Sequence, residues 1–263
     1  MTQASIFASA AAAICLVAFP AAQTATPRAA AKKEQAVPFK VGEKLTYDIG
    51  WSSYVTAGTA TMTVQEKKPS FGSTAYYIAA EGKPTPLLSN LYTLYYKVDT
   101  LLDVYSLLPQ RGSLYSEEGK RRRMKSMLFN QSARTAKYEV KTATLVQKNM
   151  KIAPYSQDAL SALYVLRSIP LKSGDTFNMP VADNGNLYTV QMVVGNVEQV
   201  SSGIGKVQAI KVSPVIRASA GEAPPARGFT IWFTTDARKL PVKMQAQLAV
   251  GAFTLTLSQA SGL

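Results

Sequence analysis

The sequence has 263 residues, with 29 Lys and Arg against 16 Asp and Glu, no His and one Cys, and its net charge is +13. Without His, a Ser-His-Asp triad, a Cys-His pair and an ordinary zinc site are excluded. If the protein is exported, this positive charge favours anionic lipid head groups or acidic glycans over nucleic acid, although charge alone selects no partner.

The first part of the chain is predicted to be a signal peptide. Residues 6–19 are almost wholly small and apolar, and this run is shorter than the roughly 20 residues that a membrane-spanning helix needs. We place the signal peptide at 1–25, with cleavage between 22 and 31; the alternative is a buried N-terminal helix. Cys15 lies in this run, so the mature chain is expected to contain no thiol.

Residues 26–37 lack periodicity and predict a flexible leader, whereas 38–263 are expected to form a single β-rich domain. In this domain apolar residues recur at every second position, as in strands with one buried and one solvated face. The clearest runs are 45–51, 58–64, 94–104, 188–194, 229–233 and 242–250. They predict a mainly β fold, with a single large curved antiparallel sheet that forms a half-barrel or a barrel.

One segment has helical spacing instead. In 157–168, Leu160, Leu163, Tyr164 and Arg167 share one stripe, which predicts an α-helix packed on the apolar face of the sheet. Ser156 is the expected N-cap, Asp158 falls in the first turn, and Pro170 ends the helix. We hypothesise that this helix acts as a lid over a cavity.

A basic run follows Gly119. If 121–129 is a strand, Arg121, Arg123 and Lys125 share one face, where guanidinium groups can bind an anionic head group in a bidentate manner. The alternative is a solvated edge, on which Lys and Arg discourage strand-to-strand aggregation.

Large apolar and aromatic side chains supply a second set of candidate ligand contacts. Aromatic residues on the concave face of a sheet can hold acyl chains or stack on sugars, and core packing is the alternative. The candidates are Trp51, Tyr95, Tyr96, Leu163, Tyr164 and Trp232.

Motifs for catalysis are scarce. No Gly-x-Ser-x-Gly sequence occurs, and no spacing of Asp and Glu selects an acid pair. We therefore predict no catalytic residues, no metal ligands and no cofactor, and we keep a carboxylate-dependent enzyme acting on envelope glycan as an alternative.

Several motifs together resemble a known family. They are Pro38-Phe39-Lys40-Val41-Gly42-Glu43, Tyr96-Lys97-Val98-Asp99, and the segments 158–167, 172–175 and 231–242. In this order they resemble the bacterial domain-of-unknown-function family numbered three thousand one hundred and eight. The resemblance implies an exported periplasmic protein dominated by a sheet, broadly like the half-barrels of lipoprotein carriers, and it implies no established activity.

These observations lead to one functional expectation with two alternatives. We expect a non-catalytic periplasmic protein of the Gram-negative envelope that binds or carries an amphipathic molecule, such as a lipid, a lipoprotein acyl chain or a glycolipid. The expected partners are thus an amphipathic or anionic envelope molecule and, peripherally, a membrane, but no nucleic acid. The glycan-directed enzyme and a scaffold of an envelope complex are the alternatives.

Overall fold

The computed structural model describes residues 32–51, 55–217, 228–248 and 251–263. The predicted signal peptide, with Cys15, and residues 26–31 of the leader lie outside this part of the chain. Within the described residues, no helix combines the length and the apolar character that crossing a membrane requires.

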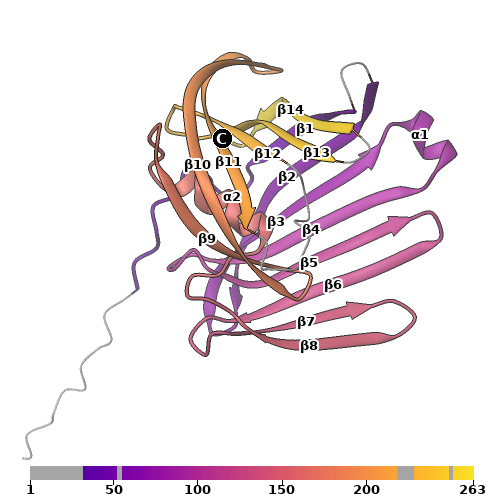
Figure 1. The fold of residues 1–263 in the computed structure, drawn as a ribbon, viewed down its shortest axis with the longest axis vertical. Coiled ribbons are helices and arrows are strands. Elements are labelled where there is room, and N and C mark those ends of the chain that lie inside the picture. Colours follow the sequence, from indigo (N-terminus) through magenta and orange to yellow (C-terminus); the bar gives the residue numbers. More distant parts are fainter. Residues whose placement is uncertain (1–31, 52–54, 218–227, 249–250) are drawn as a thin grey trace, which may run out of the picture. The chain divides into compact units, whose positions relative to one another are not determined.

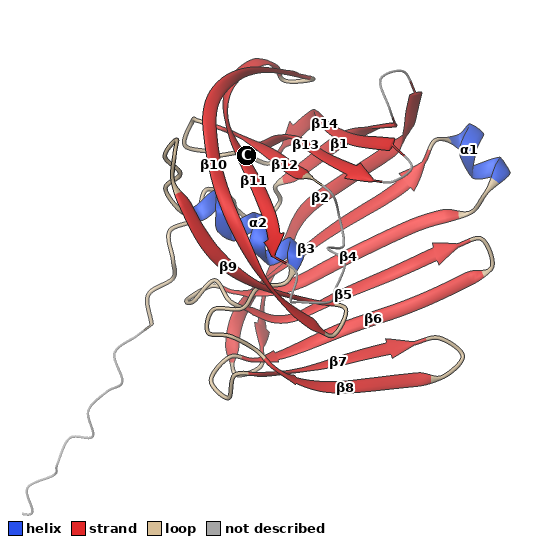
Figure 2. Ribbon diagram, viewed as in Figure 1, coloured by secondary structure: helices blue, strands red, loops and turns tan. Residues whose placement is uncertain are grey.

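The described chain is dominated by one antiparallel sheet of 14 strands (Figures 1 and 2). The strands and two helices are β1 (Lys44–Trp51), β2 (Val55–Ser70), β3 (Ser73–Pro84), α1 (Pro86–Leu91), β4 (Leu94–Asp103), β5 (Pro109–Glu118), β6 (Arg121–Asn130), β7 (Thr135–Lys141), β8 (Leu145–Lys151), α2 (Ala159–Ser168), β9 (Thr176–Asp183), β10 (Asn186–Ser202), β11 (Gly205–Arg217), β12 (Phe229–Thr234), β13 (Pro241–Leu248) and β14 (Gly251–Ser261). This architecture confirms the predicted fold class, and it adds the short helix α1.

The strand order follows the chain except at one junction. Each strand pairs with its sequence neighbours, except that β8 does not pair with β9, and β1 also pairs with β14, so that the sheet runs from β8 through β1 and β14 to β9. The ladder does not close, and β8 and β9 are its edges. Figure 1 shows the sheet curving around α2, which contacts both β4 and β9.

The helix begins two residues later than the sequence indicated. Asp158, and not Ser156, is the N-cap of α2, and its Oδ1 accepts hydrogen bonds from the backbone N–H groups of Leu160 and Ser161. The Ser161 side chain accepts from the Asp158 N–H and completes a capping box. The Ser156 hydroxyl instead donates to the Ala153 carbonyl, because a turn precedes the helix.

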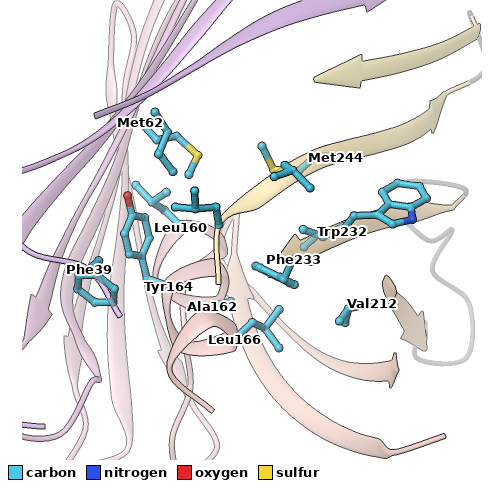
Figure 3. Close-up of a cluster of buried hydrophobic side chains, with 14 of the residues drawn as sticks. Phe39, Met62, Leu160, Ala162, Tyr164, Leu166, Val212, Trp232, Phe233 and Met244 are labelled. Carbon is cyan, nitrogen blue, oxygen red and sulfur yellow. The ribbon is translucent and has the colours of Figure 1, made fainter. Parts of the chain in front are cut away.

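The main core lies between α2 and the sheet (Figure 3). Tyr164 is fully buried, and its ring meets Phe39 edge to face at 4.9 Å between centroids. Leu160 and Leu166 are also buried, and Leu163 is partly buried against the same cluster. These contacts favour a structural role for α2 over that of a mobile lid.

A buried ion pair fixes α2 to the start of β1. Arg167 Nη1 and Nη2 donate to Glu43 Oε1 and Oε2 at 2.6 and 2.7 Å, and both side chains are almost inaccessible to solvent. The guanidinium also donates to the carbonyls of Lys239 and Arg238 in the turn before β13. Burial lowers the pKa of Arg167, but the bond and charge of Glu43 reverse this effect and raise it, so the guanidinium stays charged.

The two edges of the sheet approach each other at the α2 end through side chains. Lys125 Nζ on β6 donates to Asn184 Oδ1 in the β9–β10 turn at 2.7 Å. A Cβ added at Gly185 would lie 2.8 Å from the ring of Tyr138 on β7, so that turn sits directly on the ring. Beneath it, Ala182 of β9 joins a second buried cluster with residues of β6 and β7.

The ion pair leads to a stability prediction. Arg167→Met should lower the free energy of unfolding by about 3–5 kcal/mol, because it leaves the Glu43 carboxylate buried without a partner. The double variant Glu43→Leu/Arg167→Met should regain most of this loss, since it removes both charges. Urea denaturation of the wild type, the single variants Arg167→Met and Glu43→Leu, and the double variant measures the coupling; single losses that simply add to the double loss would show that the pair is not energetically coupled.

Candidate functional site

We call the face of the sheet that packs against α2 the inner face. Residues directly opposite each other on neighbouring strands share a face, and Tyr47 of β1 is buried in the main core. From Tyr47 a continuous row crosses five further strands on this inner face: Ala60, Gly82, Tyr96, Ser116 and Arg123. The row joins the hydrophobic core to the predicted basic strand.

Apolar character on the inner face continues beyond the buried core. On β1, burial falls from fully buried Tyr47 to partly exposed Ile49 and then to Trp51, which is 43% exposed. Leu257 is buried on β14, while Phe253, stacked on Trp51 at 6.1 Å between centroids, is partly exposed. The strands therefore carry apolar side chains toward the end opposite α2, where they are not fully covered. We call this end the open end.

Small residues form the middle of the inner face. Ala60, Gly82 and Ser116 alternate with larger side chains along their own strands, and Gly82 lies between Ala60 and Tyr96 in the row. A Cβ added at Gly82 would meet no atom within 4 Å. The sheet thus has a floor of small side chains at Ala60 and Gly82, with open space above Gly82. The core borders it on one side and Tyr96 on the other, and Ser116 and Arg123 follow beyond Tyr96.

The polar side chains that border this floor interact with one another. The Tyr96 hydroxyl donates to Glu118 Oε1 at 2.7 Å. Burial and this hydrogen bond raise the pKa of Tyr96 to about 12, while the positive charge of Arg123 opposes the rise. Arg123 is half-buried, so its charge acts in a medium less polar than bulk water.

The three predicted basic residues share the inner face but have different surroundings. Arg121 is exposed at the start of β6, opposite Glu118. Arg123 ends the row that contains the floor of small side chains, and Lys125 is held by Asn184 near α2. The structure brings Arg121 and Arg123 to the open end, and it directs Lys125 to the turn that approaches β6.

The predicted aromatic contacts are divided among three places. Trp51 and Tyr96 lie on the inner face, whereas Tyr164, with Leu163 beside it, belongs to the core around α2. Tyr95 points to the outer face, where its ring packs near Tyr115 at 6.1 Å.

Trp232 also lies away from the inner face. It is buried between Lys211 and Lys243 on the neighbouring strands, whose ammonium groups lie 5.8 and 4.9 Å from the centre of its ring, and its Nε1 donates to Glu198. Figure 3 shows the indole pointing away from Tyr164. The structure therefore does not bring Trp232 together with Tyr96.

A small acidic pocket lies at the start of α2. It has a volume of about 70 Å³ and is lined by Asp99, Asp158, Asp183 and Lys125 among others. Ligand pockets usually measure roughly 300–1,000 Å³, so this one has room for only a few water molecules.

The carboxylates of that pocket have structural partners. Asp158 caps α2 and accepts a hydrogen bond from Thr100 at 2.6 Å, while Asp99 pairs with Arg111 and Ser113. Burial raises the pKa of Asp158, and its hydrogen bonds oppose this. In the part of the chain that is described, no three acidic, His or Cys residues gather to hold a metal ion.

Sequence reasoning found the basic and aromatic borders of the inner face but not its floor. Gly82, Ala60 and Ser116 carry no chemical signal by themselves, and they become significant only because strand pairing aligns them. Phe253 was recognised as part of an alternating strand, but its stacking on Trp51 depends on the pairing of β1 with β14.

Fold and site together define a class of protein: an open antiparallel half-barrel that wraps a helix and keeps a partly exposed apolar inner face. A family model described as protein of unknown function, DUF3108, matches residues 46–258. The chain belongs to this family. The resemblance inferred from its motifs is thereby confirmed.

Comparison with solved structures gives similar chains of low identity. A β-barrel-like protein of unknown function, DUF1849, from Brucella abortus is 11% identical with a TM-score of 0.49, over 84% of this chain and 97% of that chain. A Bacteroides fragilis protein with a YmcC-like fold, provisionally assigned as exported, is 10% identical with a TM-score of 0.37, over 87% of this chain and 100% of that one.

A Parabacteroides distasonis protein, provisionally assigned as a lipoprotein, is 8% identical with a TM-score of 0.37, over 87% of this chain and 100% of that one. A comparison with curated proteins found no match.

The border of the floor gives a test of its geometry, because Glu118 and Arg123 act on Tyr96 in opposite directions. Glu118→Gln should lower the pKa of Tyr96 from about 12 toward its ordinary value, since the negative charge that favours the protonated phenol is lost. Arg123→Gln should raise it further. NMR titration of carbon-labelled tyrosine measures both shifts, and Tyr95 on the outer face is the internal control. Shifts of the same sign would contradict this arrangement.

Proposed function

We propose that the protein is an exported envelope protein that binds an anionic amphiphile carrying an acyl chain. The acyl chain lies over the floor of small side chains on the inner face, and the anionic head group lies at Arg123. The observation that carries the proposal is the open space above Gly82, which lies between an apolar face and a half-buried guanidinium.

The acyl chain of the proposed ligand is inferred from the apolar side chains around the floor. Ile49, Trp51, Phe253 and Leu255 are all partly exposed on the inner face near the open end. Removing about ten methylene groups from water contributes about 8 kcal/mol, the free energy of a micromolar complex before the cost of ordering the ligand. An acyl chain is therefore long enough to supply the affinity by burial alone.

The anionic head group of the proposed ligand is inferred from the polar side chains that border the floor. Arg123 has no ion pair among the described residues, and Glu118, the nearest acidic group in the register, is occupied by the Tyr96 hydroxyl. A guanidinium in a partly buried position binds a carboxylate or phosphate in a bidentate manner. Arg121, two residues away on the same face, adds positive charge on the solvent side.

The predicted signal peptide favours export, and the proposed ligand is one that the envelope supplies. Acyl lipids, glycolipids and lipoproteins are the amphiphiles of the bacterial envelope, so we place the protein in the periplasm. The glycan-directed enzyme is less well supported, because Asp158 is engaged in the hydrogen bonds that hold α2 to the sheet, and Asp99 is engaged by Arg111 and Ser113 on β5.

A large side chain in the space above Gly82 should weaken ligand binding without unfolding the protein. Gly82→Phe adds a ring beyond a Cβ position that has no atom within 4 Å, and we expect the affinity for a dansyl-labelled fatty acid to fall about tenfold. Thr59→Phe is the matched control, because Thr59 is exposed on the outer face of β2 and its partner Lys83 neighbours Gly82. Dye fluorescence and urea denaturation are measured on both variants.

The same assay tests the head group. Arg123→Gln should lower the affinity for the dansyl fatty acid by a similar factor, while the affinity for an uncharged dansyl alcohol should not change. Mass spectrometry of the small molecules that co-purify from the native host should detect an acylated anion bound to the wild type and not to the Gly82→Phe variant. Equal dye binding by the wild type and Gly82→Phe would refute the proposed site.

A further inference from the structure

We propose that the open end of the sheet docks on an anionic lipid bilayer through α1 and the neighbouring β5–β6 turn. We call this surface the α1 rim and define it by Leu87, Tyr92, Lys83, Lys120 and Arg121. It goes beyond the proposed ligand site, because α1 and Lys120 lie outside the row from Tyr47 to Arg123. Lys83 follows Gly82 but belongs to the outer face, and Arg121 is shared with the head-group end of that site.

The rim exposes large apolar side chains on a helix that has no charge. The sequence of α1 is PLLSNL. Leu87 is 74% exposed, and no large hydrophobic residue among those described is more exposed. Tyr92, which follows α1, is exposed as well. Exposed apolar side chains next to basic residues are a feature of surfaces that bind at the boundary between head groups and acyl chains.

Backbone contacts bring basic residues to the same place. The Gly119 N–H donates to the Thr93 carbonyl at 2.8 Å, and a Cβ at Gly119 would lie 3.1 Å from the ring of Tyr92. The β5–β6 turn, with Lys120 and Arg121, is therefore packed directly against the segment that follows α1. Figure 1 shows α1 and this turn at the same end of the sheet.

The charges of the rim are available to a partner. Lys83, Lys120 and Arg121 are exposed and form no ion pair with other described residues, whereas Arg122 is paired with Glu117 at 3.5 Å. Anionic lipid attracts such groups, and each contributes on the order of a fivefold gain in binding at low salt. A second copy of this chain would bring these like charges together, so the charge favours a bilayer as the occupant.

The opposite end of β3 differs in this respect. Phe71, in the β2–β3 turn, is 64% exposed, so apolar exposure there is comparable to that of Leu87. Its basic neighbours are neutralised, however, because Lys67 pairs with Glu34 at 2.5 Å and Lys68 pairs with Glu66 at 2.9 Å. The two ends therefore form a matched pair: both expose an apolar tip, but only the α1 rim joins it to unpaired positive charge.

The experiment compares the two ends on the full protein. Binding to vesicles of equimolar phosphatidylcholine and phosphatidylglycerol is measured by flotation for the wild type, Leu87→Gln and Phe71→Asn. We expect Leu87→Gln to weaken binding about tenfold, because burial of one Leu side chain is lost, and Phe71→Asn to leave it unchanged. Equal losses in the two variants, or no loss in Leu87→Gln, would overturn the proposal.

A second arm tests the charge. Lys120→Gln/Arg121→Gln should reduce binding and flatten its dependence on salt, and vesicles of phosphatidylcholine alone should bind weakly and without salt dependence. Sedimentation without lipid tests the alternative occupant: a wild-type dimer that Leu87→Gln dissociates would make the rim a self-interface and overturn the proposal. Leu87→Gln should retain dansyl fatty acid, so failure of the ligand site and failure of the rim are distinguishable.

Discussion

The packing of α2 on the sheet centres on one buried ion pair, because Arg167 and Glu43 join the helix, which the ladder does not hold, to two segments of the sheet. Arg167 comes from the end of α2, Glu43 precedes β1, and the remaining guanidinium bonds go to carbonyls before β13. Moving two charges out of water is costly, and here the bidentate bond and the rings of Phe39 and Tyr164, 5.5 and 5.1 Å from the guanidinium, compensate. The pair therefore specifies where the helix lies.

That position determines the difference between the two ends of the sheet. At the α2 end, the helix, the β9–β10 turn and the second cluster fill the space inside the curve. At the open end nothing among the described residues takes their place, although the strands continue for several residues with the same alternation. Stability is thus concentrated at one end, and the other end is left with apolar surface that packing does not require.

Much of the fold was accessible from sequence because strand period and helix period are local properties. The alternating runs and the helix that carries Tyr164 and Arg167 were found correctly, while the N-cap was misplaced at Ser156, since Asp158 and Ser156 are equally good capping residues. The pairing of β1 with β14 was not predictable, because their partners lie about two hundred residues apart in the chain and no local pattern encodes register. The floor of the candidate site depends on the registers of β2 to β5, which no local pattern encodes either.

The contrast between Tyr47 and Gly82 shows how one sheet face serves both as core and as candidate site. Both residues lie in one cross-strand row, on the same face and separated by Ala60 alone. At Tyr47 a large ring fills the space under α2, and its hydroxyl donates to the Pro241 carbonyl at 2.9 Å. At Gly82 the missing side chain leaves the space open. Alternation therefore fixes which face is apolar, but side-chain volume within a row decides whether that face packs against the protein or remains available to another molecule.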